Sequence, residues 1–191
     1  MQFDDPRVVL INQKKREGFG NRWEMTINES VGNFILIDDD IFIKPSQLLM
    51  LFDKLIADKN IPHGLAGSIN FKQFVDKKDM EVEILHQIYA VTREHISKYF
   101  EYKNLLEQIP SLKDISIVNS ADDILISNSG ISNAKIHDAG FILRCPTSHN
   151  ADIACYMQKG FYDKRRIIIK ELNEIKAVEK KIAELQTTDS Y

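Results

Sequence analysis

Apolar residues in this chain occur either in short uninterrupted runs or at every third or fourth position of longer, mixed segments. A short run is typical of a strand covered on both faces, and the three-to-four spacing is typical of an amphipathic helix. The runs predict strands at 7–11, 34–37, 63–71, 81–91 and 134–143, although 81–91 also fits a helix and 134–143 a hairpin. The spaced patterns predict helices at 22–30, from Pro45, at 93–109, at 121–130 and at 163–186. Strands alternating with helices predict an α/β fold with a mostly parallel sheet flanked by helices.

Two of these helices have a well-defined apolar side. The helix from Pro45 has one formed by Leu48, Leu49, Phe52, Leu55 and Ile56. The last helix spaces its apolar residues among many charges, at Ile168, Leu172, Ile175, Ile182 and Leu185. We therefore divide the chain into a main region at 1–160 and a C-terminal amphipathic extension at 161–191. The extension is expected to pack on the domain or to join two copies in a homo-oligomer. The basic cluster Lys164–Arg166 makes peripheral membrane contact a further option.

Composition narrows the class of protein. The 191 residues suffice for one domain with a real core, and 43% hydrophobic with 28% charged residues is typical of a soluble globular protein. A formal net charge of −3 gives no reason to expect nucleic acid as a partner. No apolar run approaches the roughly 18 residues of a membrane span, and the acidic N-terminus does not resemble a signal peptide. Because Cys145 and Cys155 are the only cysteines, a reducing, cytoplasmic location is expected.

Three consecutive aspartates, Asp38, Asp39 and Asp40, follow the apolar run 34–37. Adjacent carboxylates repel one another, and a bound cation is the commonest way for a folded protein to keep them together. At the carboxyl end of a strand in an α/β sheet they would border the functional crevice. Two carboxylates spaced i and i+2 suit Mn²⁺ or Mg²⁺, whose remaining positions a diphosphate can fill. The alternative is a solvated turn before the helix at Pro45.

Phosphatases of the haloacid-dehalogenase type also place D-x-D after a buried strand. In that interpretation Asp38 is the nucleophile and Asp40 the acid. Their motif continues with a small Thr or Val two residues after the second Asp, where this chain has Phe42. No later pair of acidic metal ligands is evident either, so this interpretation is the less favoured one.

The triplet is one of several ordered motifs. "GNRW" precedes "DDD" by fourteen residues, and a Pro-started helix, "GLAGS", "YAVTREHISKYFEY", "NSADDILISN" and "RCPT" follow. Together they resemble the core of a GT-A (Rossmann-like) glycosyltransferase, most closely the exostosin type, and family-2-like transferases share the pattern nearly as well. The resemblance covers roughly 7–147 and makes 1–160 the catalytic region. It implies transfer of a sugar from a nucleotide-diphosphate donor, with a UDP-sugar favoured, to a saccharide acceptor.

The family pattern implies roles on the donor side of the site. Asp40 would bind the metal, and Asp38 would approach the ribose or the metal through water. Asp39 would lie near the donor sugar. Arg22, and with it Asn21, would face the diphosphate, where a guanidinium donates paired hydrogen bonds.

On the acceptor side, the same resemblance places Asp123 beside the acceptor hydroxyl, with Asp122 as the less favoured choice. A carboxylate there acts as general base in an inverting enzyme or orients the substrates in a retaining one. His137 is the preferred candidate for a third metal ligand, ahead of His149, although a plain surface histidine is the commoner case. Trp23 is expected to anchor the core rather than to stack on a base or sugar.

The chain also departs from the family. Glu17 occupies the position of a family asparagine, and Ala121 replaces the cysteine that would pair with Cys145. The run 7–11 begins almost at Met1, so the strand–helix–strand unit that normally opens the fold is missing. We therefore expect an N-terminally truncated domain: either the chain is a piece of a longer enzyme, or a partner supplies the missing strand. The alternative is a non-catalytic module that binds a protein or a saccharide.

Overall fold

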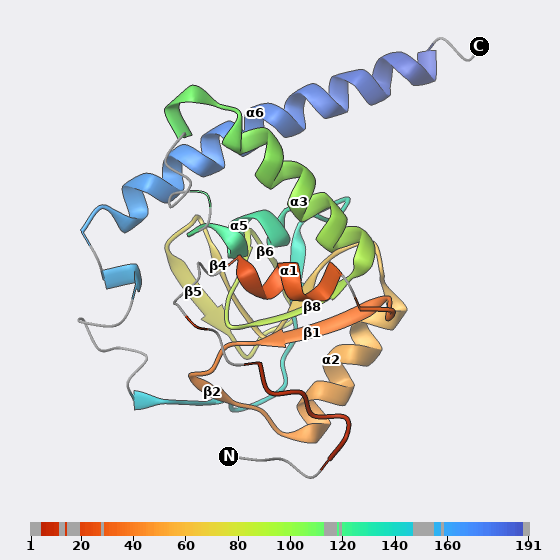
Figure 1. The fold of residues 1–191 in the computed structure, drawn as a ribbon, viewed down its shortest axis with the longest axis vertical. Coiled ribbons are helices and arrows are strands. Elements are labelled where there is room, and N and C mark those ends of the chain that lie inside the picture. Colours follow the sequence, from red (N-terminus) through yellow and green to blue (C-terminus); the bar gives the residue numbers. More distant parts are fainter. Residues whose placement is uncertain are drawn as a thin grey trace.

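The computed structural model describes residues 5–11, 14, 20–27, 29–112, 118, 120–146, 155–157 and 159–188. Their fold is mixed α/β, with a central five-stranded sheet, two smaller sheets and a long C-terminal helix (Figure 1). The α/β class and the C-terminal helix were both predicted from the sequence and are confirmed. Glu17 and His149 lie outside the described residues.

The central sheet has the strand order β1-β8-β3-β9-β6. Its strands are β1 (Asn33–Ile37), β8 (Ile88–Thr92), β3 (His63–Gly64), β9 (Ala134–Ile136) and β6 (Met80–Val82). A second sheet joins β5 (Gln73–Asp76), β4 (Ala66–Ile69) and β7 (Ile84–Leu85), and a third pairs β10 (Leu143–Arg144) with β2 (Ile41–Phe42). The predicted strands at 63–71, 81–91 and 134–143 are therefore each divided between two sheets.

The prediction of a mostly parallel sheet is wrong. Within the described strands only β3 and β9 pair in parallel, whereas β1–β8, β3–β8 and β6–β9 are antiparallel. The reason lies in the connection from β3 to β8, which runs through short strands instead of a helix. Parallel neighbours need a long crossover, while short strand-to-strand connections return the chain in the opposite direction. Because β1 and β3 both pair antiparallel with β8, they run in the same direction, and β9 runs parallel to β3. The carboxyl ends of β1, β3 and β9 therefore still lie on the same side of the sheet.

The predicted helices are confirmed within a few residues. They are α1 (Asn21–Ile27), α2 (Pro45–Ala57), α3 (Arg93–Glu107), α5 (Asp122–Ser127) and α6 (Phe161–Thr188), with 3-10 turns η1 (Pro110–Leu112) and η3 (Cys155–Met157). Pro45 suits the first turn of α2, where its missing N–H costs nothing. Thr92 caps α3 by accepting a hydrogen bond from the backbone N–H of His95.

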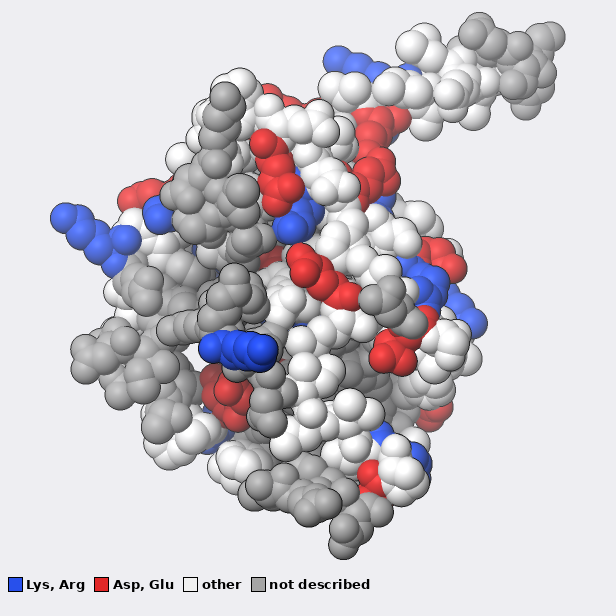
Figure 2. All heavy atoms as spheres, in the orientation of Figure 1, with Lys and Arg blue, Asp and Glu red and all other residues white. Residues whose placement is uncertain are grey.

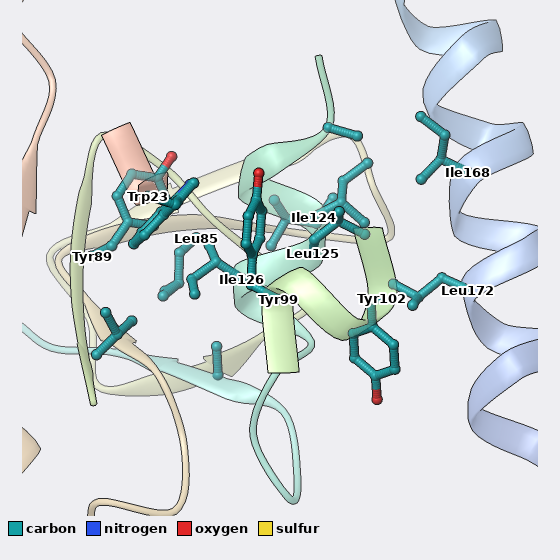
Figure 3. Packing of buried hydrophobic residues seen from close by; sticks show 14 of the residues in the cluster. Trp23, Leu85, Tyr89, Tyr99, Tyr102, Ile124, Leu125, Ile126, Ile168 and Leu172 are labelled. Atoms are coloured by element: carbon teal, nitrogen blue, oxygen red, sulfur yellow. The ribbon is translucent and has the colours of Figure 1, made fainter. Parts of the chain in front are cut away.

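The main hydrophobic core lies between the sheet and the helices α1, α3, α5 and α6 (Figure 3). Trp23 is fully buried and contacts the rings of Tyr89 and Tyr99, with centroids 5.6 and 5.7 Å away. Ile168 and Leu172 bring the first half of α6 into the same core. The prediction that Trp23 anchors the core is confirmed.

The strand predicted at 7–11 is wrong, and the strand predicted at 34–37 is confirmed with less burial than expected. Residues 7–11 form no strand, and the exposed fractions of Val8 to Ile11 range from 45% to 77%. The run at 34–37 does form a strand, but it is only partly buried, because β1 is an edge strand of the sheet. Phe34 and Leu36 pack on the main core and Ile35 packs on a second cluster with Leu51 and Leu55, so the uninterrupted apolar run reflects two partly covered faces.

The apolar side predicted for α2 is only partly the buried one. Leu51 and Leu55 are fully buried and pack on β8 and β3, while Leu49 and Phe52 remain exposed. The buried side of α2 also includes Gln47, whose amide donates hydrogen bonds to two backbone carbonyls.

Acidic and basic side chains are interspersed on the face shown in Figure 2, without a large patch of one sign. Arg165, however, is not part of a solvated basic cluster, because it is buried between α6 and the body. Only its neighbours Lys164 and Arg166 are exposed. In the described part of the chain, no helix combines the length and apolar character required to cross a membrane.

Candidate functional site

Three residues predicted for the site meet beyond the end of β1. Arg22 of α1 donates hydrogen bonds from Nε and Nη2 to Oδ2 of Asp122, at 2.9 and 2.7 Å. Its Nη1 donates to Asp38, the residue that follows β1. Trp23 Nε1 donates to the same oxygen of Asp122 at 3.2 Å. The fold thus joins α1, β1 and the start of α5 through one guanidinium.

The charges in this cluster depend on one another. Burial raises the pKa of Asp38 to about 6, against the opposing effect of Arg22 and with a smaller contribution from Asp40. Burial also raises the pKa of Asp122, against the same guanidinium. Arg22 itself keeps its charge, because Asp122, Tyr89 and Asp38 outweigh the loss of hydration. The cluster is therefore a cation shared between a buried carboxylate, Asp122, and a half-buried one, Asp38.

Asp123, the predicted catalytic residue, belongs to a second ion pair. Arg165 donates from Nη1 and Nη2 to its two oxygens at 2.8 and 2.7 Å, and His86 Nδ1 lies 3.7 Å away. Although burial opposes its charge, Arg165 lowers the pKa of Asp123 below the ordinary value. A carboxylate of lowered pKa with a bidentate partner is a weak base. This geometry suits an orienting role better than proton abstraction.

Arg165 was missed in the sequence, where it looked like part of a solvated basic cluster. Its guanidinium lies over the rings of Phe161, at 4.9 Å, and Phe71, at 5.9 Å. The available signal was its helical spacing from Ile168 and Leu172, which puts Arg165 on the buried side of α6.

Asp40 has a buried oxygen that needs a partner. Oδ1 is buried and accepts no hydrogen bond among the described residues, while the backbone carbonyl of Asp40 accepts from the N–H of Cys145 at 2.6 Å. An orphaned carboxylate oxygen beside a second carboxylate is a suitable ligand for a hard divalent cation.

Arg144 is a further residue that sequence reasoning missed. It pairs with Ile41 across β10 and β2, next to Asp40. Nε donates to Gln87 Oε1 at 2.9 Å and Nη1 lies 3.1 Å from Asp76, but Nη2 is buried without a partner in the described region. The "RCPT" motif contained this residue, and only the pairing with β2 shows that it lies beside the acidic turn.

The other predicted site residues do not join the cluster. His137 contacts His63, with 2.9 Å between ring nitrogens, and Asp79 at 3.2 Å. It follows β9, which β8 and β3 separate from β1, so its predicted role as a third metal ligand with Asp38 and Asp40 gains no support. The side chains of Asn21 and Asp39 form no hydrogen bond or ion pair with other described residues of the cluster, and Asp39 is exposed.

The described residues contain no group of three His, Cys, Asp or Glu side chains placed to hold a metal ion. Mg²⁺ sites built on substrate phosphates use one or two carboxylates, with the remaining ligands from water and phosphate. Asp38 and Asp40 fit that smaller requirement, since they are two residues apart in the chain and Oδ1 of Asp40 has no hydrogen-bond partner among the described residues.

A separate groove lies between α3 and α6. It is lined by Thr92, Lys98, Ser129, Lys176 and Glu179, among others. Lys98 is already paired with Glu179 at 2.7 Å, and Lys176 donates to Asn128 at 2.8 Å. The groove contains none of the predicted site residues.

No protein-family model matches the chain, and neither a curated protein nor a solved structure matches it significantly. The resemblance to GT-A glycosyltransferases therefore depends on the sequence motifs alone.

Proposed function

We propose that this chain is a metal-dependent glycosyltransferase of the GT-A type, which moves a sugar from a nucleotide-diphosphate donor to a saccharide acceptor. One observation carries the proposal. Arg22, Asp38 and Asp122, predicted separately from three motifs, are joined by hydrogen bonds, and the orphaned oxygen of Asp40 lies close by.

In this proposal Asp38 and Asp40 hold Mn²⁺ or Mg²⁺, which when bound would neutralise charge on the leaving diphosphate. Arg22 provides the second cation for the diphosphate. Its donors now bind Asp122 and Asp38, so a diphosphate would take over part of an existing hydrogen-bonding arrangement. A guanidinium held in place by two carboxylates and by Trp23 and Tyr89 is preorganised for that role.

On the acceptor side, Asp123 stays ionised at neutral pH because Arg165 holds it. It would orient the acceptor hydroxyl and the donor sugar rather than remove a proton.

The direct test is calorimetric titration of UDP into the full chain with Mn²⁺, repeated with EDTA. Asp40→Ala removes the orphaned oxygen, and Asp53→Ala removes an exposed carboxylate of α2 as the matched control. We expect Mn²⁺-dependent binding in the wild type and in Asp53→Ala, and at least tenfold weaker binding in Asp40→Ala, corresponding to about 1.4 kcal/mol.

Binding would justify a screen of UDP-sugars for transfer to saccharides. Binding without transfer supports the second candidate, a non-catalytic module, which is consistent with Arg22 and Asp123 both being fully paired. A folded wild type that binds no UDP, or binding that ignores both EDTA and Asp40→Ala, contradicts the metal site.

A further inference from the structure

Strand β1 leaves one row of backbone groups without a strand partner. In its antiparallel register with β8, Asp38 N–H donates to Gln87 and Arg93 N–H donates to Gly32. Because bonded residues alternate along such a pair, the even-numbered residues face β8. The N–H and C=O groups of Asn33, Ile35 and Ile37 therefore point to the open edge, where no other described strand pairs with them.

In the part of the chain that the structure describes, this edge has none of the features that usually prevent strand pairing. Natural edge strands are protected by lysine, proline, a bulge or a covering element. The strand "NFILI" has no charge and no proline, and Ile37 is 42% exposed. An exposed apolar edge of this kind favours association with another extended backbone.

We propose that the open edge of β1 binds the same edge of a second copy of this chain, which makes one continuous antiparallel sheet across a two-fold axis at Ile35. The three outward-facing residues are self-complementary. Ile35 opposes Ile35 of the other copy, and Asn33 opposes Ile37 in both directions, so every outward N–H meets a C=O. Homodimers with two-fold symmetry need this kind of self-matching surface.

The charges near the edge agree with this arrangement. Continuing the register sets Asp38 and Asp39 opposite Gly32 and Val31 of the other copy, so no carboxylate faces another carboxylate. Only an extended backbone provides alternating donors and acceptors at the strand spacing, so a lipid or a nucleic acid does not fit this edge.

The test compares the mass of the full chain over a concentration series by analytical ultracentrifugation. Ile37→Lys puts a charge on the edge, and Ile131→Lys, at a residue 84% exposed in the loop before β9, is the matched control. Asn33→Pro is the second edge variant, because its N–H makes no bond to β8 and proline is tolerated at the first residue of a strand. Circular dichroism checks that each variant is folded.

We expect a concentration-dependent dimer in the wild type and in Ile131→Lys, with a dissociation constant at least tenfold higher in both edge variants. Amide hydrogen exchange of Asn33, Ile35 and Ile37 should slow as the wild type dimerises. A wild type that is monomeric at all concentrations overturns the proposal. The open edge of β1 would then be a candidate for pairing with a strand of a different polypeptide. A dimer that forms equally in both edge variants, with unchanged exchange on β1, also overturns it.

Discussion

At the scale of single residues, Asp122 and Asp123 are sequence neighbours that bind different arginines. Asp122 accepts from Arg22 and has a raised pKa, while Asp123 accepts from Arg165 and has a lowered one. Neighbouring carboxylates whose pKa values are pushed apart are typical of sites that divide two tasks. Here Asp122 holds Arg22, the guanidinium proposed to bind the diphosphate, and Asp123 faces the proposed acceptor side.

The pKa of Asp38, about 6, predicts a pH dependence. Only the ionised carboxylate binds a metal, so Mn²⁺-dependent UDP binding should weaken as pH falls below 6, by up to about tenfold per pH unit. Without metal, the effect of pH on the free energy of unfolding has the opposite sign. The folded state binds this proton more tightly than the unfolded chain, so the contribution of Asp38 to stability declines as pH rises from about 4 to 6.

Calorimetric titration of UDP at pH 5, 6 and 7 measures the first effect, and the carbon-13 shift of the Asp38 carboxyl group measures its pKa directly. Asp53, exposed on α2, provides the reference carboxyl in the same spectra. A midpoint for Asp38 near 4, or binding that is unchanged between pH 5 and 7, would contradict this account.

At the scale of elements, helices could be predicted from the sequence and strand directions could not. The helix starts at Pro45 and Thr92 have local causes, a proline in the first turn and a side-chain cap. The direction of β8 depends on what connects it to β3, and the run 81–91 contains pieces of two sheets. Burial in α2 was misjudged for the same reason, because the position of the sheet decides that Leu51 is covered and Leu49 is not.

The candidate site, too, was predicted only where its residues carry a local sequence signal. Asp38 could be predicted from its place in an acidic triplet after a strand, whereas Arg22 and Asp122 were predicted only through the resemblance to GT-A glycosyltransferases. Arg165 and Arg144 gave no such signal, since their roles arise from contacts with Asp123 and with Gln87 that are distant in the sequence. The placement of His137 with His63 depends on the pairing of β9 with β3.

Helix α1 yields a prediction at this scale, because seven residues are too few for a helix that is stable alone. Its anchor is Trp23, which is fully buried and also donates to Asp122. Trp23→Ala should lower the free energy of unfolding by roughly 3–5 kcal/mol. Met25→Ala, on the exposed side of the same helix, should change it by less than about 0.5 kcal/mol. Urea unfolding measures both, and equal effects would show that α1 is not anchored in this way.

At the scale of the whole molecule, helix α6 packs on the core with its first half and is exposed to solvent in its second half. The first half of α6 supplies Arg165, Ile168 and Leu172 to buried positions. Beyond Lys180 the described side chains are exposed, and Figure 1 shows this end projecting from the body. The apolar residues there, Ile182 and Leu185, make α6 a rival to β1 as the surface that joins two copies.

Removing residues 181–191 separates these two modes of association. Because the described side chains of this segment are exposed, the truncated chain should keep its free energy of unfolding within about 1 kcal/mol. Leu172→Ala, in the packed half of the same helix, should cost roughly 2–5 kcal/mol. If β1 joins the two copies, the truncated chain still dimerises in the ultracentrifuge with an unchanged dissociation constant. A truncated chain that is monomeric where the wild type is dimeric would instead assign the contact to α6.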